Sequence, residues 1–193
     1  SFTGDVSTSV DNATMAYNEC MNTLKKANGD IATIGKSVCM RFLIHIVGDV
    51  HQPLHTATLF SSKFPTGDMG GNLFEIDYPA TKSLNELHAY WDSTGHHYSA
   101  SIKVPLSDHY YEELQEISQN ITEVYTRNAL KSELSKKTFE EWVDESGNKA
   151  FEFAYDSLKL KPGDTITDEY EAKARELIDR QLALGGYRLA DSL

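Results

Sequence analysis

Cysteine, long apolar runs and positive charge are all scarce in this chain of 193 residues. Only two cysteines occur, so there is no cysteine cluster of the kind that builds structural zinc sites. Apolar runs such as Phe42-Leu43-Ile44 are far too short to cross a membrane, and no signal peptide is recognisable. We therefore expect a mature or trimmed chain without a membrane span.

The charge balance is acidic, with 18 lysines and arginines against 29 aspartates and glutamates and a net charge of −11. A protein that holds duplex DNA by neutralising its phosphates needs the opposite balance, so that class is disfavoured. Phosphate substrates are still compatible with this charge, because bound Zn²⁺ can invert the local field of an acidic site. The length predicts a single domain over residues 1–193 with a hydrophobic core.

The two cysteines and two sequons bear on the compartment of the protein. Cys20 and Cys39 lie near the ends of adjacent predicted helices. They can form one disulfide, pair with residues outside this chain, or stay reduced in the core, and the sequence leaves these options open. Glycosylation sequons begin at Asn12 and Asn120, which fits an oxidising secretory route. We expect a glycosylated protein that is secreted or exposed at the cell surface.

Helical periodicity predicts an all-α fold, an irregular bundle with a small β-hairpin or loop insert. Breaks are expected at Gly29 and Pro53, and Gly95 should end a short third helix. The adjacent Gly185-Gly186 suggests close packing inside the last helix. The other helices should cover about 8–27, 33–48, 107–130, 138–158 and 168–193. Residues 56–82 look irregular, with one short strand expected over 72–78.

Five residues form the candidate metal site. His45 and Asp49, and again His88 and Asp92, stand four positions apart, which places each pair on one helix face, about 40° apart around the axis. Pro53 should end the second helix and leave His55 free beyond the break. Asp49 is the candidate bridging ligand. His55, His88 and Asp92 give three protein ligands with open positions, which is typical of catalytic zinc.

The surroundings of these ligands can also be predicted. The run Ser83-Leu84-Asn85-Glu86 reads as a capping box, which would set His88 and Asp92 well inside the third helix. Metal-bound imidazoles need a partner on their other nitrogen, and the candidates are His51, Asn85 and Glu86. The remaining histidines are expected at the surface; they are His96, His97 and His109.

These residues match a known pattern. The run from His45 to His55, ending in Gln52-Pro53-Leu54-His55, closely resembles the S1/P1 nuclease family of zinc-dependent nucleases. Gly70-Gly71-Asn72 is similar to that family's loop beside the metals, and the segment 88–93 to its second helical ligand pair. Residues 145–146 and 186–190 resemble its later helices, so the resemblance covers essentially the whole chain. The loop around 63–69 resembles the protozoan 3′-nucleotidase/nucleases.

The resemblance implies a phospholipase C/P1 nuclease-like fold that holds three zinc ions. His45 and Asp49 would bind one zinc of a close pair, with Asp49 bridging to the other. His55, His88 and Asp92 would bind the third zinc. The implied chemistry is in-line attack on phosphorus by a hydroxide held between the paired zincs, with Lewis-acid stabilisation of the leaving 3′ oxygen.

The implied activity is hydrolysis of single-stranded DNA or RNA and of 3′-nucleotides, giving 5′-phosphorylated products and nucleosides. Asn72, with Gly71 beside it, would contact substrate near the metals. Single-strand preference would come from stacking a base on an aromatic side chain, for which the candidates are Phe74, Tyr78 and Tyr90.

The sequence departs from the family pattern at its start. Mature family members begin with a tryptophan whose amino group and carbonyl bind zinc, and further ligands follow it, whereas Ser1 aligns with the middle of a member. We therefore expect this chain to be the C-terminal two-thirds or more of the domain. It should carry one complete zinc site and about half of the close pair, with the N-terminal segment as a partner that full activity requires.

Two other functions are compatible with these residues. A zinc phospholipase C shares the ligand scaffold, although that family carries glutamate where Asp92 stands. A non-catalytic, zinc-stabilised binding protein is the alternative from a different class.

Overall fold

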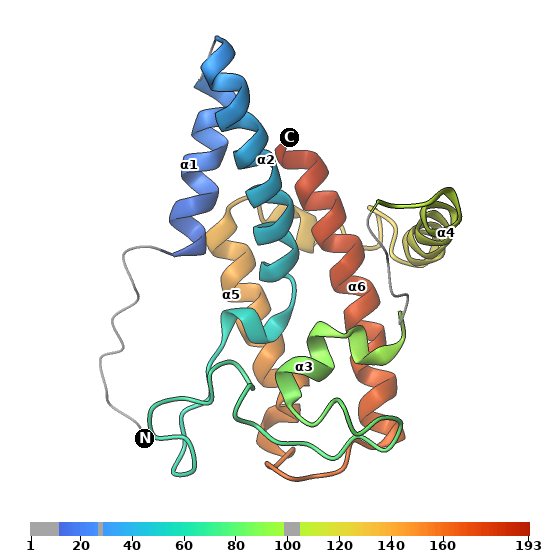
Figure 1. Ribbon diagram of the computed structural model, residues 1–193. Coiled ribbons are helices and arrows are strands. Elements are labelled where there is room, and N and C mark those ends of the chain that lie inside the picture. The colour runs from blue at the N-terminus through green and yellow to red at the C-terminus, as the bar shows by residue number, and fades with distance from the viewer. Residues whose placement is uncertain (1–11, 27–28, 99–104) are drawn as a thin grey trace.

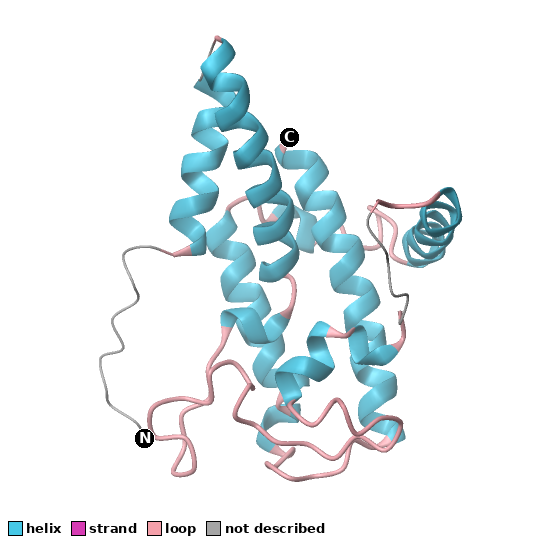
Figure 2. Cartoon of the chain, in the orientation of Figure 1, coloured by secondary structure: helices cyan, strands magenta, loops and turns pink. Residues whose placement is uncertain are grey.

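A computed structural model describes residues 12–26, 29–98 and 105–193. Helices dominate the described chain (Figures 1 and 2), which confirms the all-α expectation. In chain order the α-helices are α1 (Ala13–Lys26), α2 (Asp30–Val50), α3 (Leu87–Asp92), α4 (Asp108–Val124), α5 (Phe139–Lys149) and α6 (Asp168–Ser192). Short helical turns join them: η1 (Pro53–Thr56), η2 (Thr94–His96), η3 (Glu133–Ser135), η4 (Ala150–Ala154) and η5 (Asp156–Leu158).

Apolar side chains gather in clusters between these helices. Helix α2 packs against α1, α5 and α6, as the ribbon in Figure 1 shows. The α1–α2–α5 cluster includes Tyr17, Leu43, Val47, Phe139 and Trp142. A second cluster, beneath α3, includes Leu54, Phe74, Tyr90, Trp91 and Leu177. Together they fix the C-terminal end of α2 and the short helix α3 within one packed region, where the predicted ligands lie.

The longer helices begin at side chains that cap them. Thr138 accepts a hydrogen bond from the Glu141 amide, and the Glu141 carboxylate bonds back to the Thr138 amide. Ser107 and Thr167 cap α4 and α6 through their hydroxyls. Such oxygens satisfy amides that have no partner in the first turn. The predicted starts near 107, 138 and 168 are therefore confirmed.

Helix α2 stops where the sequence predicts. Its last residue is Val50, His51 closes the C-terminus, and Gln52 is extended. Pro53 then opens η1, and the Gln52 side-chain oxygen accepts a hydrogen bond from the Leu54 amide at 2.6 Å. Proline is tolerated at this first helical position because the amide it lacks would have no partner there. The break before Pro53 is confirmed, and His55 follows it.

The capping box expected at the start of α3 is wrong. Glu86 is the N-terminal cap, its backbone is extended, and no side chain caps the helix. An antiparallel bridge between Glu75 and Glu86 holds the backbone extended, so α3 starts only at Leu87 and spans six residues. His88 and Asp92 consequently occupy its second and last positions rather than its middle.

The strand expected over 72–78 is also wrong. The described residues there form only isolated bridges, Glu75 with Glu86 and Asp77 with Thr165. The alternation that suggested a strand is real, because Phe74, Ile76 and Tyr78 are buried. Each bridge joins a different segment, so no continuous ladder forms.

Other boundaries shift modestly. Helix α2 begins at 30 rather than 33, α4 ends at 124 rather than 130, and α5 ends at 149 before continuing as η4. Residues 8–11 and 27 of the first expected helix lie outside the described residues. Gly185 does pack closely, since a Cβ there would lie 3.2 Å from the His51 ring, whereas Gly186 has open space. Among the described residues, no helix combines the length and apolar character needed to cross a membrane.

Candidate metal centre

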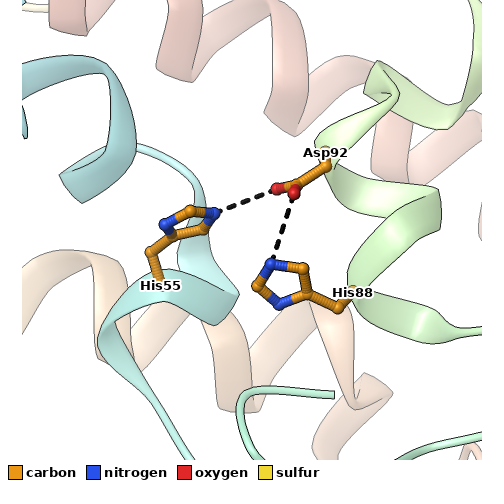
Figure 3. Close-up of side chains that lie close together, drawn as sticks. All are labelled: His55, His88 and Asp92. Atoms are coloured by element: carbon orange, nitrogen blue, oxygen red, sulfur yellow. Dashed lines mark hydrogen bonds and ion pairs between the residues drawn. The ribbon is translucent and has the colours of Figure 1, made fainter. Parts of the chain in front are cut away.

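His55, His88 and Asp92 converge at one point (Figure 3). His55 comes from η1, and the other two from opposite ends of α3. One Asp92 oxygen lies 3.0 Å from His55 Nε2, and the other lies 3.3 Å from His88 Nε2. The candidate ligand atoms of the three residues all lie within 4.8 Å of one another. The structure therefore brings together the set that was predicted to hold one zinc.

A backbone carbonyl orients His88. Its Nδ1 lies 2.7 Å from the Gly70 carbonyl oxygen. A carbonyl only accepts, so Nδ1 carries the proton and Nε2, which faces Asp92, offers a free lone pair. Gly70 has a φ of 63°, and a Cβ there would lie 2.5 Å from the Leu54 carbonyl oxygen. Only glycine fits this position without displacing its neighbours.

Gln52 holds Asp92 from the other side. Its side-chain amide donates to Asp92 Oδ1 at 2.8 Å. Partial burial raises the pKa of Asp92, but hydrogen bonds from His55 and Gln52 outweigh it, so that pKa lies below its ordinary value. The hydrogen bond with Asp92 raises the pKa of His55 despite partial burial. The carboxylate is thus held ionised, as a metal ligand must be.

His45 and Asp49 form a much more open pair. His45 Nε2 lies 3.2 Å from Asp49 Oδ2, and the His45 side chain is 75% exposed. Asp49 Oδ2 also lies 3.8 Å from His55 Nδ1, which places its carboxylate between His45 and the His55–His88–Asp92 cluster. In the described part of the chain, no third residue joins the pair to make a metal-binding group. The pair therefore offers two candidate donors, and its part in a metal site stays a prediction.

The donor chemistry of the three-residue cluster fits zinc. Two imidazoles and one carboxylate are ordinary zinc ligands, and three protein ligands leave a position for water or substrate. The cluster opens on a cleft of about 580 Å³. Residues from α2, η1, α3 and α6 line this cleft, among them Ile44, Gln52, Trp91, Ile178, Leu182 and Leu189. Of the three candidate ligands, His55 and Asp92 line the cleft themselves.

The predicted substrate contacts have different surroundings. Asn72 is exposed, and its side-chain amide donates to the Met69 carbonyl at 2.7 Å. Gly71 is buried, and its carbonyl accepts from the His88 amide at 3.2 Å. Gly71 therefore supports the start of α3, and substrate contact by either residue stays a prediction. The aromatic candidates for base stacking are wrong because all three are buried in the core; they are Phe74, Tyr78 and Tyr90.

Several predicted neighbours of the ligands lie elsewhere. His51 is buried against α6, and the backbone carbonyl of Asn85 accepts from the Ile76 amide. Gly70 and Gln52 orient the ligands instead. Both lie inside the segments that resemble the family motif, but nothing in their residue types marks them as partners of a metal ligand.

The surface exposure predicted for the remaining histidines is confirmed for two of the three. His96 and His109 are exposed, as predicted. His97 is not: its side chain is only 14% exposed and its Nε2 lies 3.9 Å from Glu171, because η2 folds back against α6.

Cys20 and Cys39 are unlinked thiols. Burial, together with the neighbouring Cys39, raises the pKa of Cys20 to about 11. A disulfide between them stays a prediction.

The structure is a helical protein in which two histidines and one aspartate converge as a candidate divalent-metal site. The sequence model of the S1/P1 Nuclease family matches residues 4–193. The chain belongs to the S1/P1 nuclease family.

Curated relatives support the same assignment. The chain is 28% identical to Endonuclease 5 of Arabidopsis thaliana, over 95% of this chain and 59% of the relative. It is 28% identical to Endonuclease 2 of the same plant, over 98% of this chain and 62% of the relative. Nuclease S1 of Aspergillus oryzae is 24% identical, over 78% of this chain and 51% of that protein. The chain thus spans about half to three-fifths of the length of these relatives.

Proposed function

We propose that the protein is a zinc-dependent phosphoesterase that cleaves single-stranded DNA or RNA and removes phosphate from 3′-nucleotides. The observation that carries the proposal is the convergence of His55, His88 and Asp92 beside a cleft that His55 and Asp92 line. Family membership supports nuclease action, and the relatives that the chain matches are named as endonucleases and as a nuclease. Zinc bound to these residues would polarise a phosphate oxygen and lower the pKa of a water molecule.

The side chains around the cleft have separable roles in this proposal. The Gly70 carbonyl keeps His88 in the tautomer that presents Nε2, and Gln52 fixes the rotamer of Asp92. Asp49 would be the bridging ligand, together with His45, whose Nε2 lies 3.2 Å from the Asp49 carboxylate. Apolar residues of α6 line the cleft opposite and limit the water around the reacting phosphate.

We further propose that the ligands needed to complete a site at His45 and Asp49 come from an N-terminal segment of the same protein. Two facts support this: the chain covers 59% of Endonuclease 5, and the pair has only two donors. Full activity would then require that segment. A zinc-stabilised binding protein without catalysis is the second candidate, and the unfinished pair is the observation that favours it.

A substrate panel tests the proposed function. The zinc-loaded protein is given single-stranded DNA, duplex DNA of the same sequence, adenosine 3′-monophosphate and phosphatidylcholine. We expect preferential cleavage of the single strand to 5′-phosphorylated fragments, loss of activity with a chelator and recovery with zinc. His88→Ala should abolish cleavage, while the exposed His109→Ala serves as the matched control. Phosphocholine release alone would indicate a phospholipase C. Zinc binding without hydrolysis would indicate the binding protein if it persists when the segment proposed to complete the His45–Asp49 pair is present.

We also propose that the protein follows the secretory route. The side chains of Asn12 and Asn120, which begin the two sequons, are exposed. Glycosidase treatment of the protein from its natural source should lower its apparent mass, and an unchanged mass would remove this support.

A further inference from the structure

A buried charged network lies behind the metal centre. Its central residue, Arg188 of α6, is 2% exposed, and His51 and Glu145 are also buried. Arg188 Nη1 lies 2.9 Å from His51 Nε2, and Nη2 donates to the Glu133 carbonyl at 2.9 Å. The same guanidinium lies 3.3 Å from the Glu145 carboxylate. One side chain thus joins the end of α2 to η3, α5 and α6, of which α2, α5 and α6 are visible in Figure 1.

The contacts of Arg188 fix the orientation of the His51 ring. A guanidinium only donates hydrogen bonds, so His51 Nε2 must accept and Nδ1 must carry the proton. That proton is donated to the Val47 carbonyl, 2.7 Å away. The backbone carbonyl of His51 accepts from the Gln181 amide at 3.0 Å. Both ring nitrogens and the carbonyl of His51 are therefore tied in place.

His51 stands within the turn that delivers the metal ligands. Asp49 precedes it by two residues, Gln52 follows directly, and His55 lies four residues on. The Gln52 side chain in turn holds Asp92. A rotation at this turn would move Asp49, Gln52 and His55 together, although Arg188 itself does not line the cleft described above.

We propose that Arg188 is a positioning residue for the metal centre, acting through His51 on the turn between Asp49 and His55. The inference rests on the proposed zinc-dependent function. A positioning role for Arg188 differs from a purely structural role in one measurable way. A structural ion pair changes only the stability of the fold, whereas a positioning residue also changes metal affinity and ligand geometry in protein that remains folded.

The test uses Arg188→Lys. Lysine keeps the positive charge beside Glu145, but its single ammonium cannot bond in one plane to His51, Glu145 and the Glu133 carbonyl as the guanidinium fork does. The matched control is Arg127→Lys, because Arg127 is exposed and pairs with Asp191 near the end of α6. Zn²⁺ affinity is measured by competition with a chelator, and Co²⁺ absorption in the visible reports the ligand geometry. Circular dichroism selects conditions in which each variant is folded.

We expect Arg188→Lys to weaken Zn²⁺ binding by about 10- to 100-fold and to alter the Co²⁺ spectrum, while Arg127→Lys matches the wild type. The milder His51→Asn carries the same expectation and replaces Arg188→Lys if the latter does not fold. Wild-type affinity and an unchanged spectrum in the folded variant would overturn the inference. A wild-type protein that binds no Zn²⁺ would instead overturn the proposed function.

Discussion

The two histidine–aspartate pairs have the same spacing in sequence but different surroundings in the fold. The His88 side chain is 17% exposed, bonds to the Gly70 carbonyl and meets His55 from another element. His45 is 75% exposed, and its side chain lies 3.2 Å from Asp49 of the same helix. Spacing at i, i+4 therefore places two donors on one face, but among the described residues only the His88–Asp92 pair gains a third donor close enough to share one ion.

The difference follows from what covers each pair. The Gly70 carbonyl contacts His88, and His55 of η1 contacts Asp92, so that pair has a backbone support and a third candidate ligand. The His45 pair lies on α2 beside the exposed side chains of Phe42 and Ile44, where it lines the same cleft as His55 and Asp92. We therefore expect changes to the covered pair to have large effects on metal binding, and changes to the open pair to have small ones.

Replacing the histidine of each pair by alanine should show the difference between the two pairs most clearly, as a difference in zinc affinity. His88→Ala removes one of three ligands and should weaken zinc binding by this chain by more than about 100-fold, whereas His45→Ala should change it by less than about threefold. Isothermal titration with zinc measures both. Equal losses in the two variants would contradict the unequal division of the site.

The loop behind His88 gives the next largest effect. Gly70→Ala places a Cβ 2.5 Å from the Leu54 carbonyl oxygen at a φ of 63°, and should lower the free energy of unfolding by about 3 kcal/mol. Gly163→Ala is the matched control, because its φ is 98° but a Cβ there meets nothing within 4 Å. Its loss should be about 1 kcal/mol. Urea unfolding compares the two, and similar losses would argue against close packing behind His88.

The buried turn beside the centre predicts a pH dependence. Burial lowers the pKa of His51 from 6.5 to about 4; its Val47 hydrogen bond and Glu145 oppose this, and the charges of Arg188 and Lys149 reinforce it. Below pH 6.5 the His51 imidazole is protonated in the unfolded chain but stays neutral in the folded chain until the pH approaches 4. The stability from this group is complete above pH 6.5 and is lost as the pH falls towards 4, in total about 3 kcal/mol.

Urea unfolding of metal-free protein between pH 7 and pH 4 tests this dependence. Relative to wild type, His51→Asn should show a slope shallower by about 1.4 kcal/mol per pH unit. A variant of an exposed side chain that does not titrate, Gln119→Ala on α4, should keep the wild-type slope. Parallel slopes in all three proteins would show that His51 is not buried as described.

Gln52 gives the smallest of these effects. Gln52→Ala removes the amide that donates to Asp92 at 2.8 Å and should weaken zinc binding about tenfold, because Asp92 keeps its bond to the metal but loses its fixed orientation. The exposed Gln119→Ala on α4 serves as the control for helix content. Unchanged zinc affinity in Gln52→Ala would show that the Gln52 hydrogen bond is not needed to orient Asp92.

Much of the fold could be predicted from local sequence. The starts of α4, α5 and α6 and the end of α2 depend on capping hydroxyls and on Pro53, which act within a few residues. The start of α3 could not be predicted in this way. A bridge to Glu75, eleven positions away, overrides the local capping signal at 83–86.

The candidate site divides in the same manner. The convergence of His55, His88 and Asp92 was expected from spacing and from the break before Pro53, but their supports were not. Gly70 orients His88 across eighteen positions, and Arg188 holds His51 across 137. Such contacts leave no periodic signal in the sequence, because they depend on how the helices pack.

The number of zinc ions that this chain binds tests the account most directly. Metal analysis after exhaustive dialysis, with zinc titration of the wild type and of His88→Ala and His45→Ala, gives that number for each pair. We expect one tightly held zinc per chain, lost in His88→Ala and retained in His45→Ala. No zinc in the wild type, or three held tightly by this chain, would contradict the division into one complete and one unfinished site.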